Sequence, residues 1–174
     1  MRIYTIIFLT ILAVISCTNS GSDDWTETEA GLIRGADSIM RVLTIEDSLD
    51  NAVLRASSKD FSATALLSSD FERLSDLMVK TVTHPSQDGV GIAGPQVGLN
   101  RRVVAVQRFD KQGEPFEVYA NVRIVWLSDS LAYGPEGCLS VPDRRGNVLR
   151  SQQIVIEYAD LASLSHSCDD IPMA

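Results

Sequence analysis

The sequence has little positive charge, few cysteines and few histidines. Its three cysteines are too few for a small scaffold that is held together by disulfides. Lys and Arg total 15 against 23 Asp and Glu, which gives a net charge of −8 without a basic cluster. Because neutralisation of phosphates dominates nucleic-acid affinity, no nucleic-acid partner is expected. With 174 residues, 45% hydrophobic and 22% charged, the chain has the composition of one globular domain.

The first residues form a nearly unbroken apolar run from position 3 to position 16. A helix of this length would rise roughly 21 Å, which is short of the ~30 Å hydrocarbon core of a bilayer. A secretory signal peptide over residues 1–16 is therefore favoured. Cys17 and the polar residues after it resemble a bacterial lipobox, in which the cysteine is lipidated. We expect an exported protein that is anchored to the membrane outside the cytoplasm, with an ordinary signal peptide and a chance cysteine as the alternative.

Periodicity predicts the main elements of the domain. Apolar residues recur at helical spacing over 70–83, and Asp70 is the expected N-cap. Residues 102–107, 118–127 and 148–158 read as strands, with a turn at 111–114. One helix followed by strands predicts an α+β fold, with a mixed or antiparallel sheet packed on that helix. For residues 25–58, one or two short helices and a segment draped over the domain both remain open.

Residues 89–94 match the G-x-G-x-x-G pattern of dinucleotide-binding domains. The context does not fit, because a predicted helix precedes the glycines and Pro95 follows them. The strand expected to begin near Val103 is also too close for the long crossover between parallel strands. A dinucleotide site is therefore rejected.

Residues 89–98 (GVGIAGPQVG) and 136–140 (EGCLS) closely resemble the first two signature motifs of the peptide deformylase family. A lone cysteine such as Cys138 would otherwise be interpreted as a small buried hydrophobe. The resemblance implies a peptide-deformylase-like domain over residues 59–161, preceded by a tether and N-terminal extension over 17–58. It also implies removal of the formyl group from N-formyl-methionyl peptides with a divalent metal, commonly Fe²⁺, with Zn²⁺, Ni²⁺ or Co²⁺ as substitutes.

The resemblance also assigns roles to individual residues. It makes Cys138 a thiolate ligand of the metal, whose charge would lower the pKa of bound water. It makes the Gln96 side-chain amide and the Leu139 backbone N–H the donors that stabilise the oxyanion. The expected substrate-binding residues, which line the peptide groove or its entrance, are Val90, Gly91, Gly137 and Arg145.

The family's third motif, His-Glu-x-x-His on a C-terminal helix, supplies two ligands and the general base, and the printed sequence does not contain it. Residues 166–170 (HSCDD) have one histidine and no glutamate. We therefore expect the metal-ligand helix to be absent, residues 162–174 to form a divergent tail, and the metal to be held weakly.

On this basis the 174 residues as written are expected to be inactive. Three other possibilities for the cysteines, the tail and the function stay open. One is a zinc site made of Cys138, His166, Cys168 and Asp169. Another is a disulfide between Cys138 and Cys168. The third is an exported lipoprotein that binds peptides without catalysis. An ion pair between Glu136 and Arg150 is also expected. The sequence departs from the family pattern at Gly94, where alanine is usual.

Overall fold

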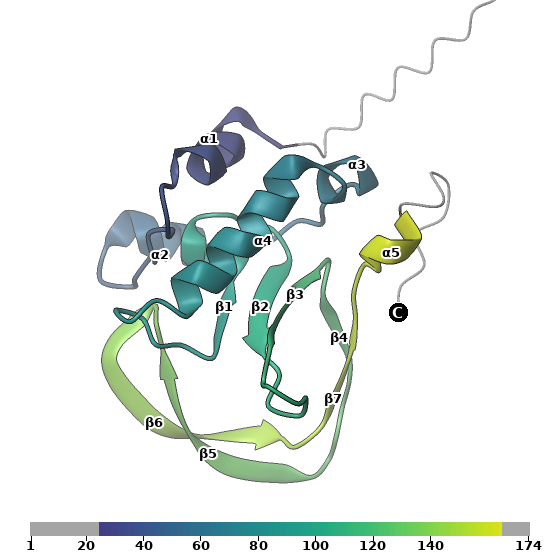
Figure 1. Cartoon of the computed structure of the whole chain (residues 1–174). Coiled ribbons are helices and arrows are strands. Elements are labelled where there is room, and N and C mark those ends of the chain that lie inside the picture. Colours follow the sequence, from purple (N-terminus) through teal and green to yellow (C-terminus); the bar gives the residue numbers. More distant parts are fainter. Residues whose placement is uncertain (1–24, 165–174) are drawn as a thin grey trace, which may run out of the picture.

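The computed structural model describes residues 25–164, which are coloured in Figure 1. The helices are α1 (Glu27–Gly35), α2 (Ser48–Arg55), α3 (Ala63–Leu66), α4 (Ser69–Val82), the 3₁₀ helix η1 (Gly94–Val97) and α5 (Leu161–Leu164). The strands are β1 (Gly91–Ala93), β2 (Val103–Gln107), β3 (Phe116–Ala120), β4 (Arg123–Leu127), β5 (Leu131–Cys138), β6 (Val141–Ser151) and β7 (Ile154–Glu157). No helix within residues 25–164 is both long and apolar enough to cross a membrane.

The strands form three separate antiparallel sheets, with orders β1-β2-β3, β4-β7 and β5-β6. Helix α4 lies across the β1-β2-β3 sheet (Figure 1) and buries Leu74, Met78 and Val82. These side chains share one core with Ile92 and Val103 of the sheet. The α+β fold class with antiparallel pairing is confirmed.

The helix predicted over 70–83 is present as α4, but its N-cap is Ser68 and not Asp70. The Ser68 hydroxyl accepts a hydrogen bond from the Phe71 N–H. Asp70 instead lies buried in the first turn, where it accepts hydrogen bonds from Arg34 Nε at 2.9 Å and Nη2 at 2.6 Å. The prediction of the cap was wrong because a distant arginine on α1 takes the carboxylate.

Residues 25–58 contain two short helices, α1 and α2, so one of the two open alternatives is the correct one. Ile33, Met40 and Leu43 from this segment are buried, and the first two belong to the main core. Arg101 joins α1 to the sheet, because its Nε lies 2.6 Å from Glu29 Oε1 and its side chain is only 5% exposed. The segment expected to be a tether and extension therefore contributes to the packing.

Two of the predicted strands are each divided in the structure. The strand predicted over 118–127 is β3 and β4, separated by Asn121 with a φ of 54°. The Asn121 side chain accepts from the Phe61 N–H and donates to the Phe61 carbonyl, at 2.7 and 3.0 Å. The strand predicted over 148–158 is the end of β6 followed by β7, and β5 was not predicted at all.

Candidate functional site

The turn between β5 and β6 carries the second motif. Cys138 and Val141 face each other across it, and Leu139 and Ser140 form its tip. Cys138 is exposed, whereas Ser140 is only 4% exposed. The turn therefore presents a thiol to solvent and inserts a hydroxyl into the protein.

Gln96 lies in η1, directly after β1. Its Oε1 accepts a hydrogen bond from the Ala93 N–H at 2.9 Å, and its Nε2 donates to Ser140 Oγ at 3.2 Å. The same Nε2 lies 4.0 Å from Cys138 Sγ, although these residues are 42 positions apart in the chain. The structure thus brings the two motifs together at the predicted pair Gln96 and Cys138.

A short segment before α2 connects the two motifs through its backbone. The Leu43 N–H donates to the Gln96 carbonyl at 2.8 Å, and the Ile45 N–H donates to the Ser140 carbonyl at 3.0 Å. Sequence reasoning missed this segment, because backbone hydrogen bonds leave no recognisable side-chain pattern. It also missed the contact of Ser140, which the motif contains but does not explain.

Leu139 is anchored beside the start of the first motif. A Cβ atom on Gly89 would lie 3.0 Å from Leu139 Cδ1 and 3.0 Å from Val82 Cγ2. The Leu139 side chain is partly buried against the main core. Packing of this side chain against the core restrains the β5–β6 turn, and with it the backbone of Leu139.

The predicted groove residues lie on two elements, the start of β1 and the β5–β6 hairpin. Val90 is 60% exposed and precedes Gly91, the first residue of β1. Gly137 pairs with Arg145 across the β5–β6 hairpin, and a Cβ on Gly137 would lie 3.7 Å from Arg145 Cγ. Arg145 is exposed, and its placement at a groove entrance stays a prediction.

The expected ion pair between Glu136 and Arg150 is present. Arg150 donates from Nε and Nη2 to the two carboxylate oxygens of Glu136, each at 2.9 Å. These hydrogen bonds lower the pKa of Glu136 and raise that of Arg150. The pair connects the two strands of the hairpin two residues before Cys138.

The described residues do not fit a metal ion. Within residues 25–164, no group of three or more His, Cys, Asp or Glu side chains converges as a ligand set would. His84 follows the end of α4, and its Nδ1 accepts a hydrogen bond from the Ser86 N–H at 3.2 Å. His166, Cys168 and Asp169 lie outside the described residues, as does Cys17. The predicted ligand Cys138 therefore has no converging set of further ligands in the part of the chain that the structure covers.

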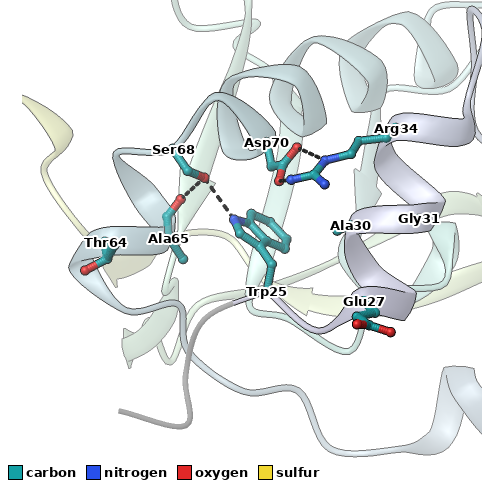
Figure 2. Close-up of a pocket in the computed structure, with 9 residues that line it drawn as sticks. All are labelled: Trp25, Glu27, Ala30, Gly31, Arg34, Thr64, Ala65, Ser68 and Asp70. Atoms are coloured by element: carbon teal, nitrogen blue, oxygen red, sulfur yellow. Dashed lines mark hydrogen bonds and ion pairs between the residues drawn. The ribbon is translucent and has the colours of Figure 1, made fainter. Parts of the chain in front are cut away.

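An open pocket of about 460 Å³ lies between α1, α3 and α4. Figure 2 shows Trp25 on one side of this pocket and the ion pair of Arg34 with Asp70 across from it. The Trp25 indole donates to Ser68 Oγ at 2.9 Å. None of the predicted site residues lines this pocket, which is separate from the Gln96–Cys138 cluster.

Comparison with known proteins gives a consistent result. The family model for polypeptide deformylase matches residues 39–169. The chain is 36% identical over 115 residues to peptide deformylase 2 of Gloeobacter violaceus, a match that covers 66% of this chain and 59% of that protein. It is 34% identical over 125 residues to the peptide deformylase of Leptospira biflexa strain Patoc 1, covering 68% and 69% of the two chains.

Solved structures agree with these sequence matches. A class I type b peptide deformylase from Acinetobacter baumannii with bound Met-Ala-Ser superposes with a TM-score of 0.62 at 30% identity, covering 78% of this chain and 80% of that one. Peptide deformylase from Thermotoga maritima gives a TM-score of 0.61 at 25% identity, covering 72% and 77%. The chain thus spans about three fifths of the Gloeobacter relative and about four fifths of the Acinetobacter structure.

Proposed function

This chain belongs to the peptide deformylase family, and we propose that its Gln96–Cys138 cluster binds the formylated N-terminus of a peptide. The observation that carries this proposal is the approach of Gln96 Nε2 to Cys138 Sγ, at 4.0 Å, from two motifs far apart in sequence. Members of this family are metal-dependent hydrolases. The Acinetobacter relative has been solved with the peptide Met-Ala-Ser bound.

The chemistry of the cluster suits a formyl group. A formyl oxygen accepts hydrogen bonds; the Gln96 amide, whose Nε2 lies 4.0 Å from Cys138 Sγ, and the backbone N–H of Leu139, the residue after Cys138, are both donors. Donors fixed in advance bind such an oxygen most strongly when negative charge develops on it. These two groups therefore supply recognition of the formyl group and would supply stabilisation of an oxyanion.

The peptide chain would lie along β1. Within the described residues β1 pairs only with β2, so its other edge can accept an extended segment as an added strand. Val90 and Gly91 stand at the start of this edge, and Gly137 with Arg145 forms the opposite rim. A short peptide with a free C-terminal carboxylate would also meet the positive charge of Arg145.

We propose that the 174 residues as written bind formyl-peptides without hydrolysing them. Hydrolysis in this family uses a metal to activate water, with Fe²⁺ as the common ion and Zn²⁺, Ni²⁺ or Co²⁺ as substitutes. A thiolate alone does not hold such an ion, since a catalytic site requires about three protein ligands. Within residues 25–164, no group of three or more His, Cys, Asp or Glu side chains converges to complete a site around Cys138.

The test compares formyl-Met-Ala-Ser with unformylated Met-Ala-Ser in calorimetric binding to the full chain. We expect preference for the formylated peptide. Gln96→Ala should reduce that preference by up to about tenfold, because it removes one hydrogen bond to the formyl oxygen, worth up to about 1.5 kcal/mol. Gln112→Ala, at an exposed glutamine in the turn before β3, is the matched control and should change nothing. Equal binding of both peptides would overturn the proposal.

The absence of hydrolysis is tested separately by measuring formate release with each of Fe²⁺, Ni²⁺, Zn²⁺ and Co²⁺ added. We expect no release above the rate with metal alone. Turnover that requires stoichiometric metal would show that a complete site exists, and His166, Cys168 and Asp169 would then be the residues to substitute.

We also propose that the protein is exported and lipid-anchored at Cys17, outside the described residues. The apolar run over 3–16 and the polar tether after Cys17 support this location. Outside the cytoplasm the groove would meet released formyl-peptides instead of nascent chains, which suits a binding lipoprotein. Radiolabelled palmitate should enter the wild-type protein but not Cys17→Ala, and labelling that survives this substitution would refute the anchor.

A further inference from the structure

The side-chain amide of Gln96 is held by a residue to which the proposed function gives no role. We propose that Ser140 is a positioning residue, whose hydroxyl orients the Gln96 carboxamide so that one of its N–H groups is available to the formyl oxygen. This inference rests on the proposed function of Gln96 and extends that function to Ser140, which accepts a hydrogen bond from the Gln96 amide.

The direction of the Gln96 amide follows from its first contact. A backbone N–H can only donate, so the Gln96 atom that lies 2.9 Å from the Ala93 nitrogen must be the carbonyl oxygen Oε1. The Nε2 atom is then forced to the side of Ser140 and Cys138. A flipped amide would lose the Ala93 hydrogen bond, because an NH₂ group cannot accept from a backbone N–H.

The amide nitrogen carries two hydrogens with unequal partners. Ser140 Oγ, 3.2 Å away on a residue that is 4% exposed, accepts one of them. Among residues 25–164, the remaining contact of Nε2 is Cys138 Sγ at 4.0 Å, and a thiol is a weak acceptor. The hydroxyl of Ser140 therefore occupies one N–H and leaves the other on the exposed side, next to Cys138.

Ser140 can perform this role because its own position is fixed. The Ile45 N–H donates to the Ser140 carbonyl at 3.0 Å, and the Leu43 N–H donates to the Gln96 carbonyl at 2.8 Å. The segment 43–45 thus sets the distance between the two backbones. Without the hydroxyl, the last torsion of the Gln96 side chain would be restrained by the Ala93 contact alone, and such sp³–sp² torsions are broad.

A double-mutant cycle on peptide binding tests whether Ser140 acts through Gln96. The variants are Ser140→Ala, Gln96→Ala and the pair, and the quantity is the ratio of affinities for formyl-Met-Ala-Ser and Met-Ala-Ser. We expect Ser140→Ala to reduce this ratio about three- to tenfold, the range for one hydrogen bond, and to have no effect in the Gln96→Ala background. Ser140→Thr, which keeps the hydroxyl, should restore the ratio. An equal effect in both backgrounds would overturn the inference.

A second measurement needs no peptide and separates this inference from the proposed function. The side-chain NH₂ signals of Gln96 are identified in a ¹⁵N spectrum by their absence in Gln96→Ala. In Ser140→Ala both signals should shift, whereas Ser86→Ala, at an exposed serine, should leave them in place. If the wild type shows no formyl preference but these signals shift, the proposed function fails and the positioning contact stands. Unchanged Gln96 signals in a folded Ser140→Ala protein would refute the role of Ser140.

Discussion

The two halves of the described chain differ in how far their large apolar side chains are buried. In residues 25–120, α4 and the β1-β2-β3 sheet enclose a core that includes Leu74 and Met78, both 0% exposed. Among the described residues beyond position 120, Ala159 is the single buried hydrophobic residue. Large apolar residues of β4 to β7 are instead 45–74% exposed: Ile124, Val125, Trp126, Leu127, Leu131, Tyr133, Leu149, Ile154 and Val155.

The difference shows that burial depends on what covers a strand, and not on the strand's composition. β2 reads VVAVQ and β4 reads RIVWL, and both are apolar enough for a core. β2 is covered by α4. The β4–β7 and β5–β6 sheets curve away below α4 in Figure 1, and no helix within residues 25–164 packs extensively on them. The candidate site lies where the halves meet, because Leu139 packs on the core and Ser140 contacts Gln96.

The largest effect should come from truncating the same kind of side chain in each half. Leu74→Ala removes a side chain that is 0% exposed, and should lower the free energy of unfolding by about 2–5 kcal/mol through lost burial and a cavity. Ile154→Ala, at a residue 53% exposed, should cost about 1 kcal/mol or less. Urea unfolding monitored by circular dichroism measures both. Equal losses would mean that the second half has a covered core after all.

The ion pairs give the next comparison. Arg101 beside Glu29 lowers the pKa of that carboxyl from its ordinary value of 4.5 to about 2, and the pair is nearly enclosed. Its stabilisation is therefore complete above pH 4.5 and is lost as the pH falls towards 2. Glu29→Gln should cost about 2–3 kcal/mol at pH 7 and little near pH 2.

The matched control is Glu136→Gln in the second half. Its partner Arg150 is 68% exposed, so water and salt screen the pair and the loss should be far smaller. Chemical unfolding of both variants at pH 7, 4 and 2.5 tests the contrast. A Glu29→Gln protein whose stability falls with acid as steeply as that of the wild type would refute the assignment.

Much of the fold could be predicted from local pattern. Helix α4 has an apolar face that repeats every three to four residues, and its existence required no tertiary information. The N-cap of α4 did require tertiary information. Ser68 and Asp70 are both residue types that cap helices, and Asp70 is bound by Arg34, so Ser68 forms the cap. The break between β3 and β4 lies within a mostly apolar run over 118–127, in which Asn121 is the one residue that readily adopts positive φ.

The part of the candidate site that consists of side chains could be predicted from the sequence motifs. The two motifs gave Gln96 and Cys138, and the structure brings them together. The backbone contacts that connect the two motifs, from the Leu43 N–H to the Gln96 carbonyl and from the Ile45 N–H to the Ser140 carbonyl, could be made by almost any residue type. Such contacts follow from the path of the chain and are visible only once that path is known.

Glycine positions sharpen the comparison at a smaller scale. A Cβ on Gly94 would lie 2.6 Å from the Arg101 carbonyl and 2.9 Å from that of Leu99, so the alanine usual in this family cannot fit without moving the backbone. Gly94→Ala should therefore cost about 1–3 kcal/mol. Gly31 lies inside α1, and a Cβ atom added there would have no atom within 4 Å. Gly31→Ala should therefore stabilise the protein by about 0.5–1 kcal/mol. Thermal unfolding should move the two melting temperatures in opposite directions, and a stabilising Gly94→Ala would contradict the close packing at this turn.

The smallest effect on stability should accompany a clear effect on the surface. Leu127 pairs with Ile154 and Ile124 pairs with Ile156, and Ile154 and Ile156 are two residues apart on β7. These side chains therefore share one face of the sheet and form a continuous apolar surface. Ile124→Thr with Ile154→Thr keeps β-branched residues in the strands, and should change the free energy of unfolding by about 1 kcal/mol or less. Fluorescence of the dye ANS should fall markedly in this variant, because the dye binds contiguous apolar surface. Leu49→Thr, at an isolated leucine of α2 that is 78% exposed, should leave the fluorescence unchanged. A double variant that binds ANS as strongly as the wild type would place the apolar surface elsewhere and remove the contrast between the two halves.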